Sequence, residues 1–474
     1  MSNDLYLNFI FFDNYGISKT QKKMKRSDIM KFEELKELLM ERKLAEVKKI
    51  YQEMNEYDIA SLIEELPDEL LVKAFRLLPK DKAVDVFVNL DEEIQRDLIA
   101  KLSKKEATLI IEDMFTDDAA DLLEEMPAMV VTSLLGSVDK ETRNDINKLL
   151  KYPENSAGSL MAVEYIHLKK GLTIKESIER IRKQADDFVS YDSCFVTDSK
   201  RKLLGHVTVK DLLINDPETM IDDVMTETEH SVHTLMDQED VVKLFQDYDY
   251  STLPVVDMED RLVGVITIDD IVDIMEEEAT EDIEKMAGMV PTEKPYLKLS
   301  LWDIFKSRMP WLLFLMVSAT FTGGIISNFE DALATCAILT VFMPMVMGTG
   351  GNAGGQSSVT IIRALSLDEV EFKDTLRVIG KEFLVGIMCG LTLAVCNFFK
   401  LIWFDGTTKM VAFVVCLSLF LTVLLAKIIG AILPILADKL HLDPAVMANP
   451  IITTIVDAGS LLVYFQVASM LLGL

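Results

Sequence analysis

One acidic side chain, Asp457, lies about halfway along the last apolar stretch of the chain, residues 444–474. An ionised acid at that depth in a membrane costs at least ~2.5–3.5 kcal/mol, so it should face water, a cation or a partner. Asn449 and Thr453 precede it at four-residue steps on one helical face. Pro450 cannot donate a helix hydrogen bond, which frees a carbonyl one turn earlier. This stripe of oxygen atoms indicates the path of a cation.

The side chains of the stripe favour one kind of cation. Mg²⁺ dehydrates reluctantly and is usually held by one or two carboxylates with several waters, so one Asp457 from each copy of a dimer would suit it. Softer metals prefer Cys or His, which the stripe lacks. The alternative is that Asp457 is a structural acid, either neutral or paired with Lys427. Lys427, however, lies in the inner half of its own apolar stretch and can extend toward the cytosol.

A glycine-rich stretch, residues 348–358, interrupts the second apolar region with the sequence Gly-Thr-Gly-Gly-Asn-Ala-Gly-Gly-Gln-Ser-Ser. As pore lining it would supply carbonyl, amide and hydroxyl oxygens, with Gly348 and Asn352 among the lining residues. Close packing of helices through small residues is the other interpretation, and the two are compatible. A nucleotide-binding loop is excluded because no Lys follows the glycines.

The elements that must position these groups are apolar stretches long enough to span a membrane, which takes about 20 residues. They are residues 309–329, 332–362, 383–399, 410–437 and 444–474, which predicts five spans. Basic residues gather before the first stretch and between the second and third. Because basic loops stay on the cytosolic side, we expect a cytosolic N-terminal part and an external C-terminus, in the cell (inner) membrane.

The net charge of -29 is carried almost entirely by the part before Leu301, because residues 301–474 hold 10 basic and 12 acidic side chains. Such an acidic surface argues against nucleic-acid binding, which needs cationic surface. It suits cations as ligands, although a field that maintains solubility is the plainer interpretation. The chain shows no nucleophile–base pair and no phosphate loop, so we do not expect an enzyme.

Residues 30–152 predict a series of short helices. Helix starts recur every 11 to 13 residues, at Pro67, Pro79, Asp91, Ser103, Thr116, Pro127 and Asp139. Proline presets a first turn, and Asp, Ser and Thr accept its free N–H groups. Units this short must stack to be stable, so the period indicates a helical superhelix.

Residues 153–275 contain a duplicated strand–turn–strand–helix pattern. Each half carries Gly-x-x-Thr-x-x-Asp, ending at Thr208 and Asp211 in the first half and at Thr267 and Asp270 in the second. The duplication resembles a tandem pair of CBS domains, modules that often bind adenosyl ligands. The resemblance implies ribose contacts by these Thr and Asp residues. An ordinary strand-to-helix turn is the alternative.

A strongly acidic helix follows, with acids at 269, 270, 273, 276, 277, 278, 281, 282 and 284. Like charges three and four residues apart repel one another and weaken a helix. A bound cation would neutralise them. A partner's basic residues, or solvent and salt, would do the same.

In this order the segments resemble the MgtE family of magnesium channels over residues 30–474. The resemblance is carried by residues 344–352 with Gln356 and Ser357, by Asp443-Pro-Ala, by Asn449-Pro and by Asp457. It implies a homodimer in membrane lipid with the pore on its axis, with Asp457 as the pore aspartate and Asn449 as a pore-lining asparagine. Lys427 is not expected from the resemblance.

The resemblance also implies where regulatory Mg²⁺ would bind, and that it closes the pore. The implied ligands are Glu239, Asp249, Asp270, Asp273, Glu278, Glu281 and Asp282, with Asp118 and Asp121 as looser matches. ATP binding at the CBS pair is implied at Asp211, with Thr208 and Tyr250 beside it.

The expected fold is therefore a multi-domain membrane protein. It has an N-terminal extension (1–29), an all-α superhelical N-domain (30–152), an α/β tandem CBS pair (153–275), an acidic plug helix with its linker (276–300) and a five-helix transmembrane domain (301–474). The expected function is a channel that imports Mg²⁺ down its electrochemical gradient. A secondary divalent-cation transporter or exporter is the first alternative, and a nucleotide-sensing signalling protein anchored by its spans is the second.

Overall fold

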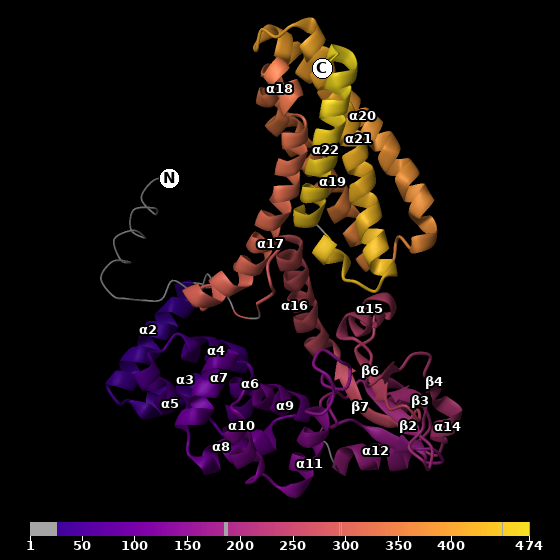
Figure 1. The fold of residues 1–474 in the computed structure, drawn as a ribbon. Coiled ribbons are helices and arrows are strands. Elements are labelled where there is room, and N and C mark those ends of the chain that lie inside the picture. Colours follow the sequence, from indigo (N-terminus) through magenta and orange to yellow (C-terminus); the bar gives the residue numbers. More distant parts are fainter. Residues whose placement is uncertain (1–25, 184–187, 293, 295, 448, 474) are drawn as a thin grey trace. The chain divides into compact units, whose positions relative to one another are not determined.

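The structure is a computed structural model that describes residues 26–183, 188–292, 294, 296–447 and 449–473 (Figure 1). The chain divides into two compact units, residues 1–275 and 276–474. The first unit holds a helical domain followed by two small sheets. The second holds the long apolar helices.

The helical domain confirms the predicted series of short helices. Its helices are α2 (Arg26–Met40), α3 (Leu44–Glu53), α4 (Glu56–Glu64), α5 (Asp68–Phe75), α6 (Ala83–Val88), α7 (Glu92–Lys101), α8 (Lys104–Asp113), α9 (Thr116–Glu124), α10 (Ala128–Leu135) and α11 (Lys140–Leu149). Ser103 and Glu106 form a full capping box at the start of α8. One predicted start is wrong: residues after Pro79 form a turn, closed by Lys82 N–H to the Pro79 carbonyl (3.2 Å), and α6 begins at Ala83.

Bonds between helices distant in the sequence hold the superhelix together. The carboxylate of Glu64 accepts the N–H of Asp91, and Glu112 accepts the N–H of Asp139, at 2.8 and 2.9 Å. Each pair lies 27 residues apart, so a side chain from one helix caps the third helix after it. Arg76 also forms a bidentate pair with Glu106. The length of the helical repeat therefore determines which helices these hydrogen bonds connect.

The duplicated part forms two sheets. Its elements are β1 (His167–Lys169), α12 (Ile174–Lys183), β2 (Ser193–Thr197), β3 (Leu203–Thr208), α13 (Val209–Ile214), α14 (Ile221–Val224), β4 (Thr226–Glu227), β5 (Val232–His233), α15 (Gln238–Tyr248), β6 (Thr252–Val256), β7 (Leu262–Thr267) and α16 (Ile268–Met286). The strand orders are β1-β2-β3-β4 and β5-β6-β7. In both, the first pair is parallel and the next is antiparallel, as expected of a repeat.

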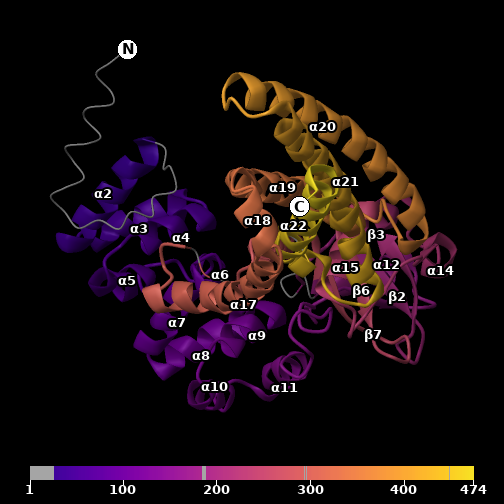
Figure 2. The same cartoon turned by 45° about the horizontal axis from the view of Figure 1, so that its top comes forward.

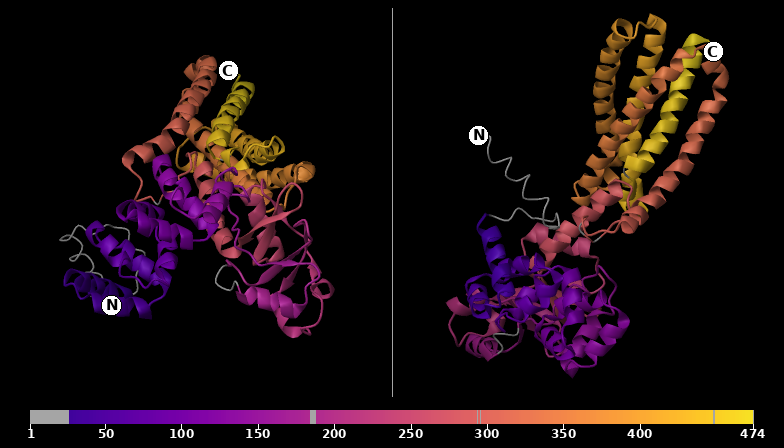
Figure 3. Two further views of the ribbon diagram at one scale, coloured as in Figure 1. Left: turned by 90° about the horizontal axis from the view of Figure 1, so that it is seen from below. Right: turned by 90° about the vertical axis from the view of Figure 1, so that its left-hand side faces the viewer.

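The second unit contains long apolar helices that run side by side (Figure 3, right). Its elements are α17 (Leu301–Asn328), α18 (Glu330–Thr335), α19 (Ile338–Ser366), η1 (Phe372–Asp374), α20 (Thr375–Trp403), α21 (Lys409–Lys439), η2 (Pro444–Met447) and α22 (Asn449–Leu472). The helices α19, α21 and α22 pack against one another, whereas α20 lies at the edge against α21 (Figure 2).

By length and hydropathy, four helices in the described part of the chain could cross a membrane: α17, α20 together with η1, α21, and α22 from Pro450. The helix α19 has 29 residues but is not among them. Its glycines, Asn352 and Gln356 lower the hydropathy of a stretch that is otherwise apolar. The predicted count of five spans therefore stays a prediction.

Candidate functional site

Asp457 lies in the middle of α22 and is half-buried. Among the described residues it has no ion-pair partner. Thr453, one turn earlier, is also half-buried and packs beside Gly351 of α19: a Cβ on that glycine would lie 3.2 Å from Thr453 Cγ2. The side chain of Asn449 lies outside the described part of the structure. Two members of the predicted stripe thus lie on α22 as expected, with α19 next to them.

Glycines allow α19 to approach α21 and α22 closely. A Cβ on Gly350 would lie 2.7 Å from Thr422 of α21 and 2.8 Å from Ser460 of α22. A side chain at Gly430 of α21 would collide with the backbone of Gly354. Only glycine tolerates such approach, so the small-residue packing considered for this stretch is confirmed.

A different face of α19 is exposed and carries the polar groups. Pro344, Gly348, Asn352 and Gln356 are all exposed and follow one another at four-residue steps. Residues spaced in this way lie on one side of a helix. A Cβ on Gly348 would meet nothing within 4 Å. The glycine-rich stretch therefore has two faces, one packed against α21 and α22 and one presenting an amide-bearing stripe.

Lys427 is paired with an acid other than Asp457. Its Nζ lies 3.8 Å from Glu382 of α20, and both side chains are largely buried. Ser357 Oγ of α19 donates to the same carboxylate at 2.5 Å. The pair of Lys427 with Asp457, considered above as the alternative, is therefore not formed. No sequence pattern pointed to Glu382, which lies one residue outside the apolar stretch 383–399.

The end of α16 is tied to the segment before α22. Lys285 Nζ lies 2.6 Å from Glu281 and 2.8 Å from Asp443. Burial alone would lower the pKa of Lys285, but its hydrogen bonds to Asp443 and Glu281 outweigh that effect and raise it. Of the other acids predicted to bind metal on this helix, Asp273 is exposed, and Glu278 and Asp282 are half-buried. A lysine thus already neutralises part of the acidic helix.

Three acids are gathered where α9 meets the start of α16, within the first unit. Burial, with repulsion from Asp270, Asp269 and Glu164, raises the pKa of Asp118 to about 7. Burial also raises the pKa of Asp270 to about 6. Asp117 is buried and its pKa is raised, by burial first and then by Asp118 and Asp270. Uncompensated carboxylates of this kind favour a proton or a cation between them.

The two aspartates predicted on α9 differ in their burial. Asp118 lies in the buried acidic group, whereas Asp121 is exposed. Asp117 was not predicted. Nothing in the sequence separates it from its neighbour, because both lie in the first turn of an acidic helix.

Glu239 and Asp249 lie at opposite ends of α15. Glu239 is in its first turn, 3.5 Å from Lys243 Nζ. Asp249 follows the last residue of the helix with φ 52° and ψ 38°, in the left-handed region. Among the residues that the structure describes, no group of three or more His, Cys, Asp or Glu side chains comes close enough to hold a metal. The predicted metal ligands are thus present as single acids and pairs.

The Thr–Asp motifs of the CBS-like repeats cap helices. Thr208 Oγ1 donates to Asp211 at 2.6 Å, and the two residues complete a capping box at the start of α13. Thr267 donates to Asp270 at the same distance. The strand-to-helix turn considered as the alternative is therefore present, and the implied ribose contact is an additional role that stays a prediction.

Tyr250 belongs to an aromatic cluster. Its hydroxyl lies 2.9 Å from His230 Nδ1, and its ring stacks on Tyr248 with centroids 5.7 Å apart. The rings of His230 and Tyr248 are 4.0 Å apart. Neither His230 nor Tyr248 was among the predicted ligand residues, because their approach to Tyr250 depends on how the chain folds around the end of α15.

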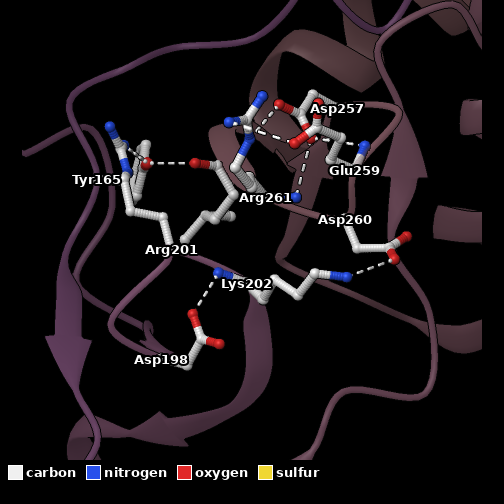
Figure 4. Close-up of polar contacts among 9 residues, drawn as sticks. Tyr165, Asp198, Arg201, Lys202, Asp257, Glu259, Asp260 and Arg261 are labelled. Atoms are coloured by element: carbon white, nitrogen blue, oxygen red, sulfur yellow. Dashed lines mark hydrogen bonds and ion pairs between the residues drawn. The ribbon is translucent and has the colours of Figure 1, made fainter.

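The two CBS-like repeats are joined through their equivalent turns (Figure 4). Lys202 pairs with Arg261 in a β-bridge, and its Nζ lies 3.3 Å from Asp260. Arg201 donates to the Tyr165 hydroxyl at 2.8 Å, and that hydroxyl donates to the Leu262 carbonyl at 3.2 Å. Equivalent parts of each repeat therefore contact one another, as expected for a tandem pair.

Comparison with known proteins shows which family has the same order of domains. Family models match at residues 54–155 (MgtE intracellular N domain), 157–217 and 221–277 (CBS domain) and 343–467 (MgtE, divalent cation transporter). The magnesium transporter MgtE of Thermus thermophilus is 38% identical over 360 residues, covering 75% of this chain and 79% of that protein. The chain belongs to the MgtE family. The Bacillus subtilis MgtE is 36% identical over 372 residues, covering 77% of this chain and 80% of its own.

A solved structure agrees with the MgtE assignment. The crystal structure of the soluble part of a magnesium transporter has a TM-score of 0.50 and 28% identity, and covers 53% of this chain and 99% of that one. The N-terminal helical domain and the CBS pair match the MgtE architecture in this structure and in the family models, and the apolar C-terminal helices match it through the family model at residues 343–467.

Proposed function

We propose that this MgtE chain forms a homodimeric Mg²⁺ channel in the cell membrane, with the ion path along α19 and α22. The observation that carries the proposal is Asp457, a mid-helix acid without an ion-pair partner among the described residues. The exposed polar face of α19 supports it, with Gly348 and Asn352 on that face. In a monomer this face has no counterpart, so we place it on the axis of a dimer.

The proposal takes α19 as the fifth span. It is long enough, since 29 residues at about 1.5 Å each reach roughly 43 Å, and its polar face would line water rather than lipid. Five spans place the C-terminus outside when the N-terminal unit is cytosolic. Thr453 and Asn449 would then lie on the cytosolic side of Asp457.

We further propose that cytosolic Mg²⁺ closes the channel through acids of the first unit and of α16. The raised pKa values of Asp118 and Asp270 support this, because they mark carboxylates that repel when empty. The proposed ligands comprise those two with Asp121, Glu239, Asp249, Asp273, Glu278, Glu281 and Asp282. Mg²⁺ would favour the packed state by its differential affinity for it.

ATP binding at the CBS pair is proposed at Asp211, Thr208 and Tyr250. The aromatic cluster of Tyr250 with His230 and Tyr248 supports it, because adenine stacks on such rings. Tyr250→Ala should weaken ATP binding while Tyr191→Ala, on the equivalent position of the first repeat, serves as control. Equal ATP affinity in both variants and the unchanged protein would contradict this site.

The decisive experiment is Mg²⁺ flux into liposomes containing the full chain, with Mg²⁺ varied on the side of the N-terminal unit. Asp457→Asn should lower flux at least tenfold, because the carboxylate that attracts the ion is gone while its shape is kept. Asp405→Asn, an acid that pairs with Lys400 outside the proposed path, should leave flux unchanged. Full flux in Asp457→Asn would refute the ion path. Flux without unitary currents would favour a secondary transporter.

A further inference from the structure

The first two turns of α17 are exposed although they are largely aromatic and apolar. Leu301 is 88% exposed, Trp302 62% and Phe305 46%. The rings of Trp302 and Phe305 stack with their centroids 5.0 Å apart and an interplanar angle of 8°. Lys306 and Arg308 beside them are also exposed. This end of the helix thus combines stacked rings with positive charge.

The segment is basic in a chain whose net charge is -29. Residues 294–308 contain four basic residues, Lys294, Lys298, Lys306 and Arg308, and one acid, Asp303, with Glu293 just before them. Asp303 is engaged in the helix cap, since it accepts from Ser300 Oγ at 2.6 Å. The four basic residues outnumber this one acid, so residues 294–308 carry a net positive charge.

The geometry of α17 places this end outside the apolar core of a membrane. The helix has 28 residues and spans roughly 42 Å at about 1.5 Å per residue, against a hydrocarbon thickness of about 30 Å. The charge-free part begins after Arg308. Pro310 lies inside the helix, and the first part of α17 runs at an angle to the remainder (Figures 1 and 2), as expected near a proline.

We propose that residues 294–308 form an interfacial segment that binds anionic phospholipid of the cytosolic leaflet. Lys306 and Arg308 would contact the headgroup, and Trp302 and Phe305 would lie at the boundary with the acyl chains, where aromatic residues are enriched. The anionic cytosolic leaflet attracts basic residues of this kind. The proposal rests on the proposed orientation of the spans. Continuity with a spanning helix favours lipid over an acidic protein as the partner.

Two hydrogen bonds connect the segment to the end of α16. Ser307 Oγ donates to the Val290 carbonyl at 2.5 Å, and Val290 N–H donates to the Ser307 carbonyl at 2.9 Å. Thr292 N–H in turn donates to Glu284 of α16 at 2.8 Å. Lipid bound at residues 294–308 therefore acts on the same linker that joins the acidic helix to the first span. Membrane surface charge becomes a second input to the proposed gate.

The position of Trp302 can be tested directly, because the chain has three tryptophans. Trp311→Phe with Trp403→Phe leaves Trp302 as the reporter in the full chain, reconstituted in phosphatidylcholine–phosphatidylglycerol vesicles. Lipid brominated near the headgroup should quench its fluorescence, and aqueous iodide should not. Trp302→Phe with Trp311→Phe provides a matched control that reports Trp403. Quenching by iodide, or protection from both quenchers by a second copy or another protein surface, would overturn the proposal.

Headgroup selectivity is tested by spin-labelled phosphatidylglycerol against phosphatidylcholine at low salt. Lys306→Gln with Arg308→Gln should lower the preference for the anionic lipid about fivefold for each charge, the equivalent of ~1 kcal/mol per basic residue. Lys400→Gln with Lys409→Gln, which removes two charges from a different loop, should leave it unchanged. An unchanged preference in the first variant would overturn the proposal. Both readouts measure lipid contact, so they fail or hold independently of Mg²⁺ transport.

Discussion

At the scale of single residues, the buried acids of the first unit should make metal-free protein sensitive to pH. Asp118 and Asp270, with pKa values of about 7 and about 6, bind protons more tightly when folded than when unfolded. Stability should therefore fall as pH rises from about 4 to about 7, and should recover as pH is lowered. Protonation removes the repulsion among these carboxylates.

This is measured by thermal unfolding of the full chain with EDTA between about pH 5.5 and about pH 8. We expect a midpoint several degrees higher at the acidic end, and a smaller difference in Asp118→Asn, which is already neutral. Glu259→Gln, an exposed acid on a CBS turn that pairs with Arg261, is the control. A midpoint that rises with pH in the unchanged protein would contradict the assignment.

The pair of Lys427 and Glu382 gives a second residue-scale prediction. Lys427→Met would leave Glu382 buried without a counter-charge, which costs ~3–5 kcal/mol. Adding Glu382→Gln should restore most of the lost stability, because no unpaired charge then remains. The measurement is a double-mutant cycle on unfolding in detergent. The exposed pair Lys400–Asp405 is the control, with an expected cost below ~1 kcal/mol, and strict additivity at Lys427 and Glu382 would show that the two do not interact.

This pair also shows what sequence cannot predict at the residue scale. A lone lysine in an apolar stretch was visible, but its partner depends on which helix lies beside α21. Glu382 belongs to α20, whereas Asp457, the acid considered from the sequence, belongs to α22. Likewise Asp117 and Asp118 are adjacent in the sequence, and only packing separates their surroundings.

At the scale of elements, the packing of α19 against α21 depends on glycine. Gly430→Ala would place a methyl group into the backbone of Gly354, and overpacking of this kind costs ~1–3 kcal/mol. We expect a lower unfolding midpoint in detergent. Gly380→Ala in α20 has no atom within 4 Å of the new Cβ and should be neutral or slightly stabilising. Equal stability of both variants would mean that the helices do not approach so closely.

Element boundaries were predictable where the sequence carries a capping residue. Asp91, Ser103 and Asp139 each accept backbone N–H groups at the helix starts predicted from them. Pro79 shows the limit of this reasoning, since a proline begins a turn as readily as a helix. The span of α19 was predicted from its lack of charge, but its polar face leaves its hydropathy below that of the other long helices.

At the scale of the whole molecule, the proposed gate predicts that Mg²⁺ protects the linker from cleavage. With millimolar Mg²⁺, residues 269–290 should resist limited proteolysis, because a cation offsets the repulsion among acids of α16. Without Mg²⁺ they should be cut. The readout is the pattern of fragments from the full chain in liposomes or detergent.

Sodium at equal ionic strength is the control for general screening, and Asp118→Asn with Asp270→Asn should need more Mg²⁺ for the same protection. Equal cleavage with and without Mg²⁺ would remove the sensor hypothesis while leaving the ion path at Asp457 intact. The domain order on which this prediction depends could be predicted from the resemblance to MgtE proteins. The approach of the acids of α9 to those of α16 could be seen only in the structure.

The proposed role of Asp249 as a regulatory Mg²⁺ ligand would set local stability against the response to Mg²⁺. It ends α15 in the left-handed conformation, where glycine fits without strain and other residues cost ~1–2 kcal/mol. A glycine there would relieve the backbone strain but would remove one of the proposed Mg²⁺ ligands. The chain instead has an aspartate in the left-handed backbone conformation at this position. Asp249→Gly is therefore expected to stabilise the end of α15 while weakening the proposed response to Mg²⁺.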